Sequence, residues 1–360
     1  MRVCILGDCH FGMRNDSAAF HDYYKKFYQE CFFPYIKKHG IKTVIQSGDM
    51  FDRRKFINFN TLYKARQYFF SEFNNEDDPI DLIVYIGNHD SYHKNSIEIN
   101  SPELLLREYK NIKVITKPEI YQLGQIYVDI IPWICDDNKQ QIEEFISKSD
   151  RTVCFGHFEI NGFEMDRGVV CNSGIDRSYL NKYEMVISGH FHHRSTDGHI
   201  FYVGSPGAIT WADYGDKRGF HIFDTETKEL EFIENPFHMF HKIVYDERIE
   251  TLDTISKKDF SILTNTMVKI VVFNKENPIL FDHFMDAVYK ASPLDVKIME
   301  DFTDISEQIE NDVIDQTDST IDILDKTVDS IEIGLDKDKM KYILRNVYNE
   351  ALEKTNDQFS

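Results

Sequence analysis

Five short glycine-containing motifs of the 360-residue sequence carry side chains that can bind metal ions. They supply two carboxylates, one amide and four imidazoles, from Asp8, His10, Asp49, Asn88, His157, His190 and His192. Seven such groups suit two divalent cations if one carboxylate bridges them, and Asp49 is the best bridge because it is the lone carboxylate in GDMF. Oxygen and nitrogen ligands without a thiolate favour manganese or iron over a structural zinc site.

The motifs are informative as an ordered set, because a single GD, GNHD or GHF is usually a turn or a buried histidine. Here all of them occur behind apolar runs, as GDCHFG (7–12), GDMF (48–51), GNHD (87–90), GHF (156–158) and GHFH (189–192). Two metal ions ~3.5–4 Å apart can activate a water molecule and neutralise the charge that develops on a phosphate. The set therefore indicates hydrolysis of a phosphate ester. Histidines without this context are expected at surface or core positions, namely His21, His39, His199, His221, His238, His241 and His283.

The elements that would position these motifs alternate between strands and helices at the start of the chain. Residues 2–7 and the runs TVIQSGD and LIVYIGNHD predict strands, and apolar spacing predicts helices over residues 20–36 and 62–73. Pro34 is expected to bend or end the first helix. This order predicts a parallel sheet with crossover helices, in which ligands gather outside the carboxyl ends of the strands.

After residue 110 the chain becomes richer in strands, up to a hairpin in DTETKELEFIE near residue 235. The predicted fold class is therefore α/β, a two-sheet α/β sandwich with helices outside. Residues 236–300 predict a small α/β capping domain of strand, helix and strand. Residues 301–335 are acidic and predict a linker. Residues 336–360 predict a helix, because one apolar stripe follows helical spacing through Met340, Ile343, Leu344, Val347, Ala351 and Leu352.

The charge of the chain is strongly acidic. Lysine and arginine number 41 against 61 aspartates and glutamates, a net of −20, and residues 300–338 alone carry −12. An acidic field counts against binding nucleic acid through the whole surface, although local basic clusters occur at residues 53–55 and 217–218. No apolar run reaches the roughly 20 residues that span a bilayer. The six cysteines form no C-x-x-C pair, which indicates reduced thiols in a cytoplasmic protein.

The ordered motifs resemble those of the calcineurin-like metallophosphoesterase superfamily over residues 1–210. Within it, GDCHFG and a GNHD that ends in aspartate are similar to the SbcD (Mre-eleven) nucleases of double-strand-break repair. GDMFDR also fits the GDxxDR motif of protein phosphatases, but Arg54 stands where those enzymes have glycine. The segment YVGSPGAITWADYGDKRGF is similar to the glycine-serine-proline segment of the nucleases, and the GHFEINGFEM region looks most like phage members.

The resemblance implies roles for the site residues. The implied ligand sets are Asp8, His10, Asp49 and His192 for one metal, and Asp49, Asn88, His157 and His190 for the other. His89 would be the catalytic histidine near the scissile phosphate, without binding a metal. Many relatives carry a phosphate-stabilising histidine where this chain has Asp52, so Arg53 or Arg54 is a candidate replacement that contacts nucleic acid. The alternative for these arginines is a solvated surface run.

The resemblance further implies a metal-dependent DNA exonuclease and endonuclease subunit of an SbcCD-like complex. Such a complex acts in double-strand-break processing, recombination and recombination-dependent replication. The cofactors would be two divalent ions, with manganese expected and magnesium or iron as alternatives. The partners would be DNA, a second copy in a homodimer, and an SbcC-like coiled-coil ATPase bound through residues 336–360. A phage-encoded member would lie in the host cytoplasm, away from any membrane.

Two other functions fit part of the sequence. A metallophosphatase acting on a phosphoprotein or a small phosphomonoester would share the fold and the metals. A non-catalytic scaffold of a repair complex would be expected to have lost at least one ligand, and the ligand set here is complete. The nuclease is therefore the favoured interpretation, with the phosphatase as the alternative.

Overall fold

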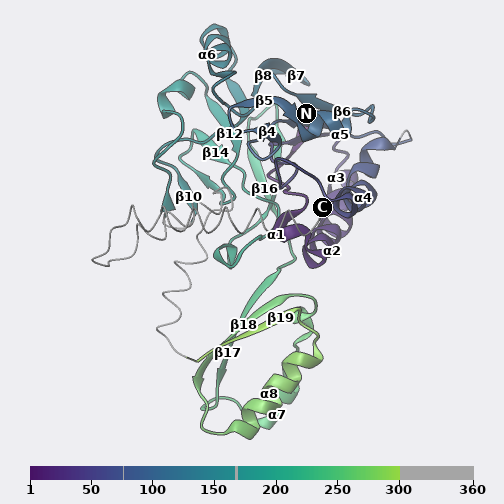
Figure 1. Cartoon of the computed structure of the whole chain (residues 1–360), viewed down its shortest axis with the longest axis vertical. Coiled ribbons are helices and arrows are strands. Elements are labelled where there is room, and N and C mark those ends of the chain that lie inside the picture. Colours follow the sequence, from purple (N-terminus) through teal and green to yellow (C-terminus); the bar gives the residue numbers. More distant parts are fainter. Residues whose placement is uncertain (76, 167–168, 301–360) are drawn as a thin grey trace, which may run out of the picture. The chain divides into compact units, whose positions relative to one another are not determined.

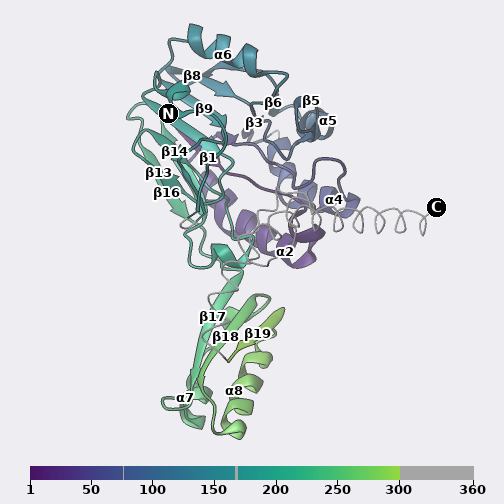
Figure 2. The ribbon, with the colours of Figure 1, turned by 60° about the vertical axis from the view of Figure 1, so that its left-hand side comes forward.

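The structure is a computed structural model that describes residues 1–75, 77–166 and 169–300. Figures 1 and 2 show the chain from two directions. The predicted acidic linker (301–335) and the predicted terminal helix (336–360) lie outside the described residues.

One sheet has six strands, in the order β16 (Leu230–Glu234), β15 (Gly219–Asp224), β1 (Arg2–Leu6), β2 (Thr43–Gln46), β3 (Asp81–Tyr85) and β6 (Ile112–Ile115). Strands β1, β2, β3 and β6 run parallel. The first three are buried almost throughout, which explains why their sequences are nearly continuous apolar runs. Strands β15 and β16 form the predicted antiparallel hairpin at one edge.

A second sheet has six strands, in the order β13 (Ser195–Thr196), β14 (Ile200–Tyr202), β12 (Met185–Gly189), β9 (Val153–His157), β8 (Ile126–Ile131) and β7 (Glu119–Leu123). The two sheets stack, because Ile5 and Ile45 of the first share a buried cluster with Phe155 and Ile187 of the second. The motif GHF lies at the end of β9 and GHFH at the end of β12, and these strands pair in parallel. The predicted two-sheet α/β sandwich is confirmed.

Helices cover the outer faces of both sheets (Figures 1 and 2). The first sheet packs against α2 (Ala18–Phe27), the π-helical turn η1 (Tyr28–Phe32), α3 (Phe33–Lys38), α4 (Phe59–Tyr68), the 3-10 turn η2 (Phe70–Asn74) and α5 (Ser101–Leu106). The predicted helix over residues 20–36 is thus continuous but contains a widened turn. Pro34 is the second residue of α3, which directly follows this π-helical turn, and it does not end the helix. Helix α6 (Lys139–Lys148) buries Ile142 and Ile146 against the second sheet.

A small sheet contains three parallel strands, β17 (Phe240–Asp246), β18 (Met267–Asn274) and β19 (Asp295–Met299). Helices α7 (Leu252–Lys257) and α8 (Pro278–Lys290) and the turn η5 (Ser261–Leu263) contribute to a separate buried cluster with this sheet (Figure 1). The sequence predicted β18, α8 and β19 but missed β17 and α7. A separate cluster supports a capping domain, while its boundary at residue 235 stays a prediction.

Short elements account for the remaining secondary structure of the described residues. They are α1 (Met13–Asp16), η3 (Arg177–Leu180), η4 (Trp211–Asp213), the pair β4 (Ser91–His93) and β5 (Ser96–Asn100), and the pair β10 (Glu164–Asp166) and β11 (Val169–Val170). Within the described ranges, no helix combines the length and apolar character needed to cross a membrane. All six cysteines are free thiols.

Candidate metal centre

The five motifs meet because the carboxyl ends of β1, β2, β3, β9 and β12 come together in the sandwich. Hydrogen bonds join their loops. The backbone N–H of His10 donates to the carbonyl of Asp49 over 3.0 Å, and the N–H of His190 donates to Asp8 Oδ2 over 3.0 Å. All seven predicted ligands lie in this cluster. Five of them are buried, namely Asp8, His10, Asp49, Asn88 and His157.

The loops that carry the ligands are sharply folded. His10, Asp49 and His190 adopt φ values of 45°, 52° and 90°, a region that residues with a Cβ rarely occupy. Gly48 has φ +89°, and a Cβ at this position would lie 2.5 Å from His157 Nδ1. Glycine at position 48 therefore leaves the space that the His157 ring occupies.

The first group of candidate ligands contains Asp8, His10 and His192, whose donor atoms all lie within 4.8 Å of one another. The Nε2 atoms of His10 and His192 are 2.9 Å apart, and His192 Nε2 lies 4.0 Å from Asp8 Oδ2. Donors bound ~2.1 Å from one ion lie about 3 Å or more from each other. The spacing of this group therefore suits a single cation.

The second group contains Asp49, His157 and His190, again within 4.8 Å, and Asn88 extends it. Asn88 Oδ1 lies 2.9 Å from His157 Nε2 and 2.9 Å from His190 Nδ1. His157 Nδ1 lies 2.7 Å from the carbonyl of Ser47. Donation of that N–H to the carbonyl leaves Nε2 as the atom available to a metal.

Asp49 is the member of the second group that also faces the first group. Its Oδ2 is 3.8 Å from His10 Nε2 and 3.4 Å from His157 Nε2. Its Oδ1 accepts the backbone N–H of His89 over 2.7 Å, which fixes the orientation of the carboxylate. A bridging carboxylate would need this position, so the donor set fits two divalent cations.

Burial and charge set the protonation of these groups in the metal-free protein. Burial raises the pKa of Asp8 to about 7. Burial also acts to raise the pKa of Asp49, but the charges of His157 and His89 hold it well below its ordinary value. Burial acts to lower the pKa of His157, but the Asp49 carboxylate raises it to about 9. A bound cation would replace these imidazole protons as the counter-charge of the carboxylates.

His89 lies beside both ligand groups. Its Nδ1 is 2.6 Å from the carbonyl oxygen of Asp52, and its ring centroid is 4.8 Å from that of His10. Burial lowers the pKa of His89. Donation of Nδ1–H to the carbonyl leaves Nε2 available for proton exchange. The donor atoms of His10, Asp52 and His89 form a third cluster within 4.8 Å.

The two candidate arginines differ in their surroundings. Arg53 Nη1 pairs with Asp16 Oδ2 over 2.8 Å, and Arg53 Nη2 donates to Asn15 Oδ1 over 2.5 Å. Arg54 Nη1 is buried and has no hydrogen-bond partner in the described part of the chain. Burial lowers the pKa of Arg54, and the Asp49 carboxylate acts in the opposite direction. Arg54 therefore keeps an unused donor that is subject to the charge of Asp49, whereas Arg53 is already paired.

Sequence reasoning missed the supporting role of two carboxylates inside the motifs. Asp90 is fully buried and accepts the N–H groups of Phe51 and Gly87 over 3.2 and 2.9 Å, so it joins two ligand loops. Asp52 Oδ1 lies 3.4 Å from His10 Nδ1. Both positions were visible in GDMFD and GNHD, but the sequence did not show which groups these side chains would reach.

A two-sheet α/β sandwich with clustered carboxylate, amide and imidazole donors at its strand ends defines a class of metal-dependent phosphoesterase. Residues 1–194 match the calcineurin-like phosphoesterase family, and the chain belongs to this family. The chain is 36% identical over 272 residues to exonuclease subunit 1 of Enterobacteria phage T4. The aligned region covers 76% of this chain and 77% of that protein.

The predicted resemblance to metallophosphoesterases and to a phage nuclease is confirmed, as is the predicted phosphate-ester hydrolase. The role of each ligand remains a prediction.

Two solved structures show a weaker likeness. An archaeal phosphodiesterase matches with a TM-score of 0.34 and 15% identity, over 65% of this chain and 99% of that chain. The inner membrane complex anchor of Plasmodium matches with a TM-score of 0.40 and 13% identity, over 66% of this chain and 90% of that chain. At these scores neither likeness adds to the argument about the site.

Proposed function

We propose that this chain is a metal-dependent nuclease that hydrolyses phosphodiester bonds of DNA, as an exonuclease and endonuclease. The observation that carries the proposal is the pair of neighbouring donor groups, with Asp49 facing histidines of both, in a calcineurin-like phosphoesterase. The T4 relative is named as an exonuclease subunit, which supports DNA as the substrate.

The proposed ligands are the seven side chains of the two groups, with Asp49 between them. When bound, two divalent ions supply Lewis acidity and an activated water for attack on phosphorus. Mixed oxygen and nitrogen donors without thiolate support manganese, with magnesium or iron as alternatives. The ligands thereby determine where the scissile phosphate lies.

His89 is the proposed catalytic residue. The carbonyl of Asp52 fixes its Nδ1 side, so Nε2 would exchange a proton with the leaving 3′ oxygen or stabilise the charge on it. A phosphate near the ring favours its protonated form, because an opposite charge raises a histidine pKa. Arg54 would donate its buried Nη1–H groups to a phosphate oxygen.

DNA binding requires local positive charge on a chain with a net charge of −20. The basic cluster at residues 217–218 does not provide it, since Arg218 is only 5% exposed. On the small sheet, however, Lys242, Lys269 and Lys297 lie directly opposite one another on β17, β18 and β19. Their side chains share one face, but Lys269 is 7% exposed and its ammonium lies 4.3 Å from the centre of the Trp211 ring. Lys242 and Lys297, on either side of it, are therefore the two lysines of this row that a phosphate can reach. A phosphate backbone that contacts Lys242 and Lys297 of this lysine row would contribute affinity.

We also propose a homodimer formed through the early helices. Phe59 and Tyr63 of α4 are 90% and 62% exposed, and Leu104 of α5 is 68% exposed. Arg66 of α4 pairs with Glu108, just after α5, over 2.5 Å, so these helices are neighbours. Large exposed apolar side chains on neighbouring helices are typical of a protein interface.

The proposed setting is an SbcCD-like complex in DNA double-strand-break processing, recombination and recombination-dependent replication. The T4 relative is named as a subunit, which supports a multi-subunit assembly. The partner would be an SbcC-like coiled-coil ATPase that binds the apolar stripe of residues 336–360. Six free thiols support a reducing cytoplasm, that of the host if the chain is phage-encoded.

The decisive experiment measures DNA digestion with and without Mn²⁺ for the wild type and for Asn88→Ala. We expect Mn²⁺-dependent release of nucleotides by the wild type and a large loss in the variant. A parallel assay with p-nitrophenyl phosphate tests the phosphatase alternative. Fast hydrolysis of that monoester without digestion of DNA would replace the nuclease by a phosphatase.

A further inference from the structure

Arg218 precedes β15 of the first sheet, and its guanidinium reaches the loop that follows β12 of the second sheet. It is 5% exposed. Arg218 Nη1 donates to the carbonyl oxygen of His192 and, over 2.9 Å, to Ser205 Oγ. Arg218 therefore links the two sheets at the backbone of a candidate metal ligand.

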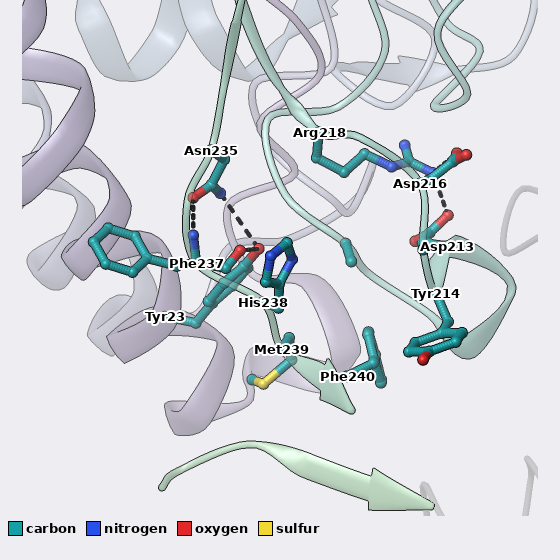
Figure 3. Close-up of a pocket in the computed structure, with 12 residues that line it drawn as sticks. Tyr23, Asp213, Tyr214, Asp216, Arg218, Asn235, Phe237, His238, Met239 and Phe240 are labelled. Carbon is teal, nitrogen blue, oxygen red and sulfur yellow. Dashed lines mark hydrogen bonds and ion pairs between the residues drawn. The ribbon is translucent and has the colours of Figure 1, made fainter. Parts of the chain in front are cut away.

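Two buried carboxylates fix the other side of this guanidinium. Arg218 Nη2 pairs with Asp213 Oδ1 over 2.5 Å and with Asp216 Oδ2 over 3.0 Å. Figure 3 shows Arg218 reaching these two side chains at the edge of a small pocket. Asp216 Oδ2 also lies 2.7 Å from His193 Nδ1, so the same ion cluster contacts the residue after His192.

The carbonyl of His192 has a second donor and little free space. The backbone N–H of Ser205 donates to it over 3.1 Å. Gly204 has φ +70°, and a Cβ at that position would lie 2.7 Å from the same oxygen. The backbone of Gly204 and Ser205 therefore packs tightly against the His192 carbonyl.

His192 needs such support more than the other histidine ligands. Its side chain is 33% exposed, compared with 12% for His190, 2% for His10 and 0% for His157. The Asp8 carboxylate accepts the backbone N–H of His190. The backbone of His192 is held at its carbonyl, which accepts from Arg218 and from the N–H of Ser205.

We propose that Arg218 is a positioning residue that holds His192 in its ligating orientation. The affinity of the group Asp8, His10 and His192 for its cation then depends on Arg218, although Arg218 touches neither metal nor substrate. This inference rests on the proposed metal ligation and adds a residue from outside the five motifs. A planar guanidinium can bond the carbonyl and both carboxylates at once, whereas a lysine ammonium cannot reproduce that fork.

The test is Mn²⁺ titration by calorimetry of the wild type, Arg218→Lys and the control Arg248→Lys. Arg248 also pairs with an aspartate, Asp246, over 2.5 Å, but on the small sheet. We expect Arg218→Lys to lose about 10–100-fold of the affinity for one of two ions, as supporting residues of metal sites typically do. The other ion and the Arg248→Lys control should remain unchanged. Saturating Mn²⁺ should restore most of the turnover of Arg218→Lys.

A double-mutant cycle separates positioning from a general structural role. If Arg218 acts through His192, then Arg218→Lys should cause no further loss of Mn²⁺ affinity in a His192→Ala background. Equal weakening of both ions, additive losses in the cycle, or unchanged binding by Arg218→Lys would each overturn the proposal. Should Arg218→Lys not fold, Asp216→Asn keeps the arginine and is expected to weaken the same ion less strongly; unchanged binding there would also overturn it. A wild type that binds two Mn²⁺ but leaves DNA intact would contradict the nuclease and not this inference.

Discussion

Asp49 is the residue with the widest influence on the site. Its carboxylate faces His10 on one side and His157 on the other, and it is 1% exposed. A buried carboxylate in this position is stable only with positive partners, because an unpaired buried charge is costly. In the metal-free protein those partners are imidazolium groups, and in the loaded protein they would be the two cations.

Replacement of Asp49 should therefore affect both ions together. We expect Asp49→Ala to lose both Mn²⁺ ions and all nuclease activity while remaining folded, since the residue follows a strand end and is not part of the apolar core. The measurement is metal content by mass spectrometry, with circular dichroism as the check on folding. Asp78→Ala, which removes a surface partner of Lys42, is the matched control. Two ions still bound to Asp49→Ala would contradict the bridging role.

Replacement of His89 should separate chemistry from metal binding. We expect His89→Ala to keep two Mn²⁺ ions and to lose ~10²–10⁴-fold of turnover, the usual contribution of a proton-transfer or charge-stabilising group. His93→Ala, a nearby exposed histidine, should behave as the wild type. Loss of a metal from His89→Ala would instead place His89 among the ligands.

The buried side chain of His221 is expected to make the free energy of unfolding depend on pH. It lies in β15 and is 4% exposed, and burial lowers its pKa from 6.5 to about 3. Between these values the unfolded chain binds a proton that the folded chain does not, so stability is complete above pH 6.5 and falls as the pH drops towards 3. At pH 5 the loss amounts to roughly 2 kcal/mol of the free energy of unfolding.

Denaturant unfolding in EDTA at pH 7.5 and pH 5 would measure this contribution. The loss of stability between the two pH values should be smaller in His221→Phe than in the wild type by that amount. His39→Phe, at an exposed position, should show the wild-type loss. Equal losses in all three proteins would mean that His221 does not titrate as its burial implies.

The candidate ligands were predictable because each lies in a short motif at a strand end, and the sequence orders those motifs. Asp90 and Asp52 belong to the same motifs, yet their supporting contacts depend on turn geometry that spacing does not reveal. The buried position of Arg218 could not be predicted from the sequence. This residue appeared as part of a basic surface cluster, and only the packing of β15 beside the β12 loop shows that it is buried.

At the scale of elements, strands β1, β2 and β3 were predictable because they are buried almost throughout and hence continuously apolar. Strand β17 was missed because its sequence, FHKIVYD, mixes charged and apolar residues. That mixture has a structural reason. Ile243 and Tyr245 belong to the buried cluster shared with α8, while Lys242 lies on the opposite face.

The lysine row across β17, β18 and β19 predicts how DNA binding responds to salt. We expect Lys242→Glu with Lys297→Glu to weaken DNA binding and to reduce the slope of log affinity against log salt by about 2, roughly one unit for each lost phosphate contact. Fluorescence anisotropy with a labelled duplex at several salt concentrations would measure both. The control with the same charge change is Lys257→Glu with Lys290→Glu, on α7 and α8. An equal effect of both pairs would mean that total charge, and not the row, determines binding.

Across the whole chain, the distribution of charge suggests that DNA binding and partner binding belong to different segments. Residues 300–338 hold −12 of the net −20, so a nucleic acid would meet the least repulsion on surfaces formed by earlier residues. The apolar stripe from Met340 to Leu352 has a length at which an isolated helix is only marginally stable in water. It therefore needs a surface to pack on, either this chain's own capping domain or, as we propose, the ATPase.

Removal of that stripe should uncouple the nuclease from its partner. We expect deletion of residues 336–360 to leave Mn²⁺-dependent digestion of single-stranded ends nearly intact and to abolish both co-purification with the ATPase and any dependence on ATP. Pull-down and digestion assays on the same preparation would measure these effects. Replacement of Lys339, Lys341 and Lys354 by alanine keeps the stripe and serves as the control. A truncated chain that binds the ATPase with unchanged affinity would show that the stripe is not the tether.

The left-handed backbone of His10, Asp49 and His190 also has a consequence for protein engineering. A residue with a Cβ is about 1–2 kcal/mol less stable than glycine in this backbone conformation. Selection of a mutant library for thermal stability alone would therefore favour glycine or asparagine at these three positions. The selected variants would be thermostable but would have lost metal ligands and hence activity. Heat tolerance in this protein is better sought with positions 10, 49 and 190 held constant.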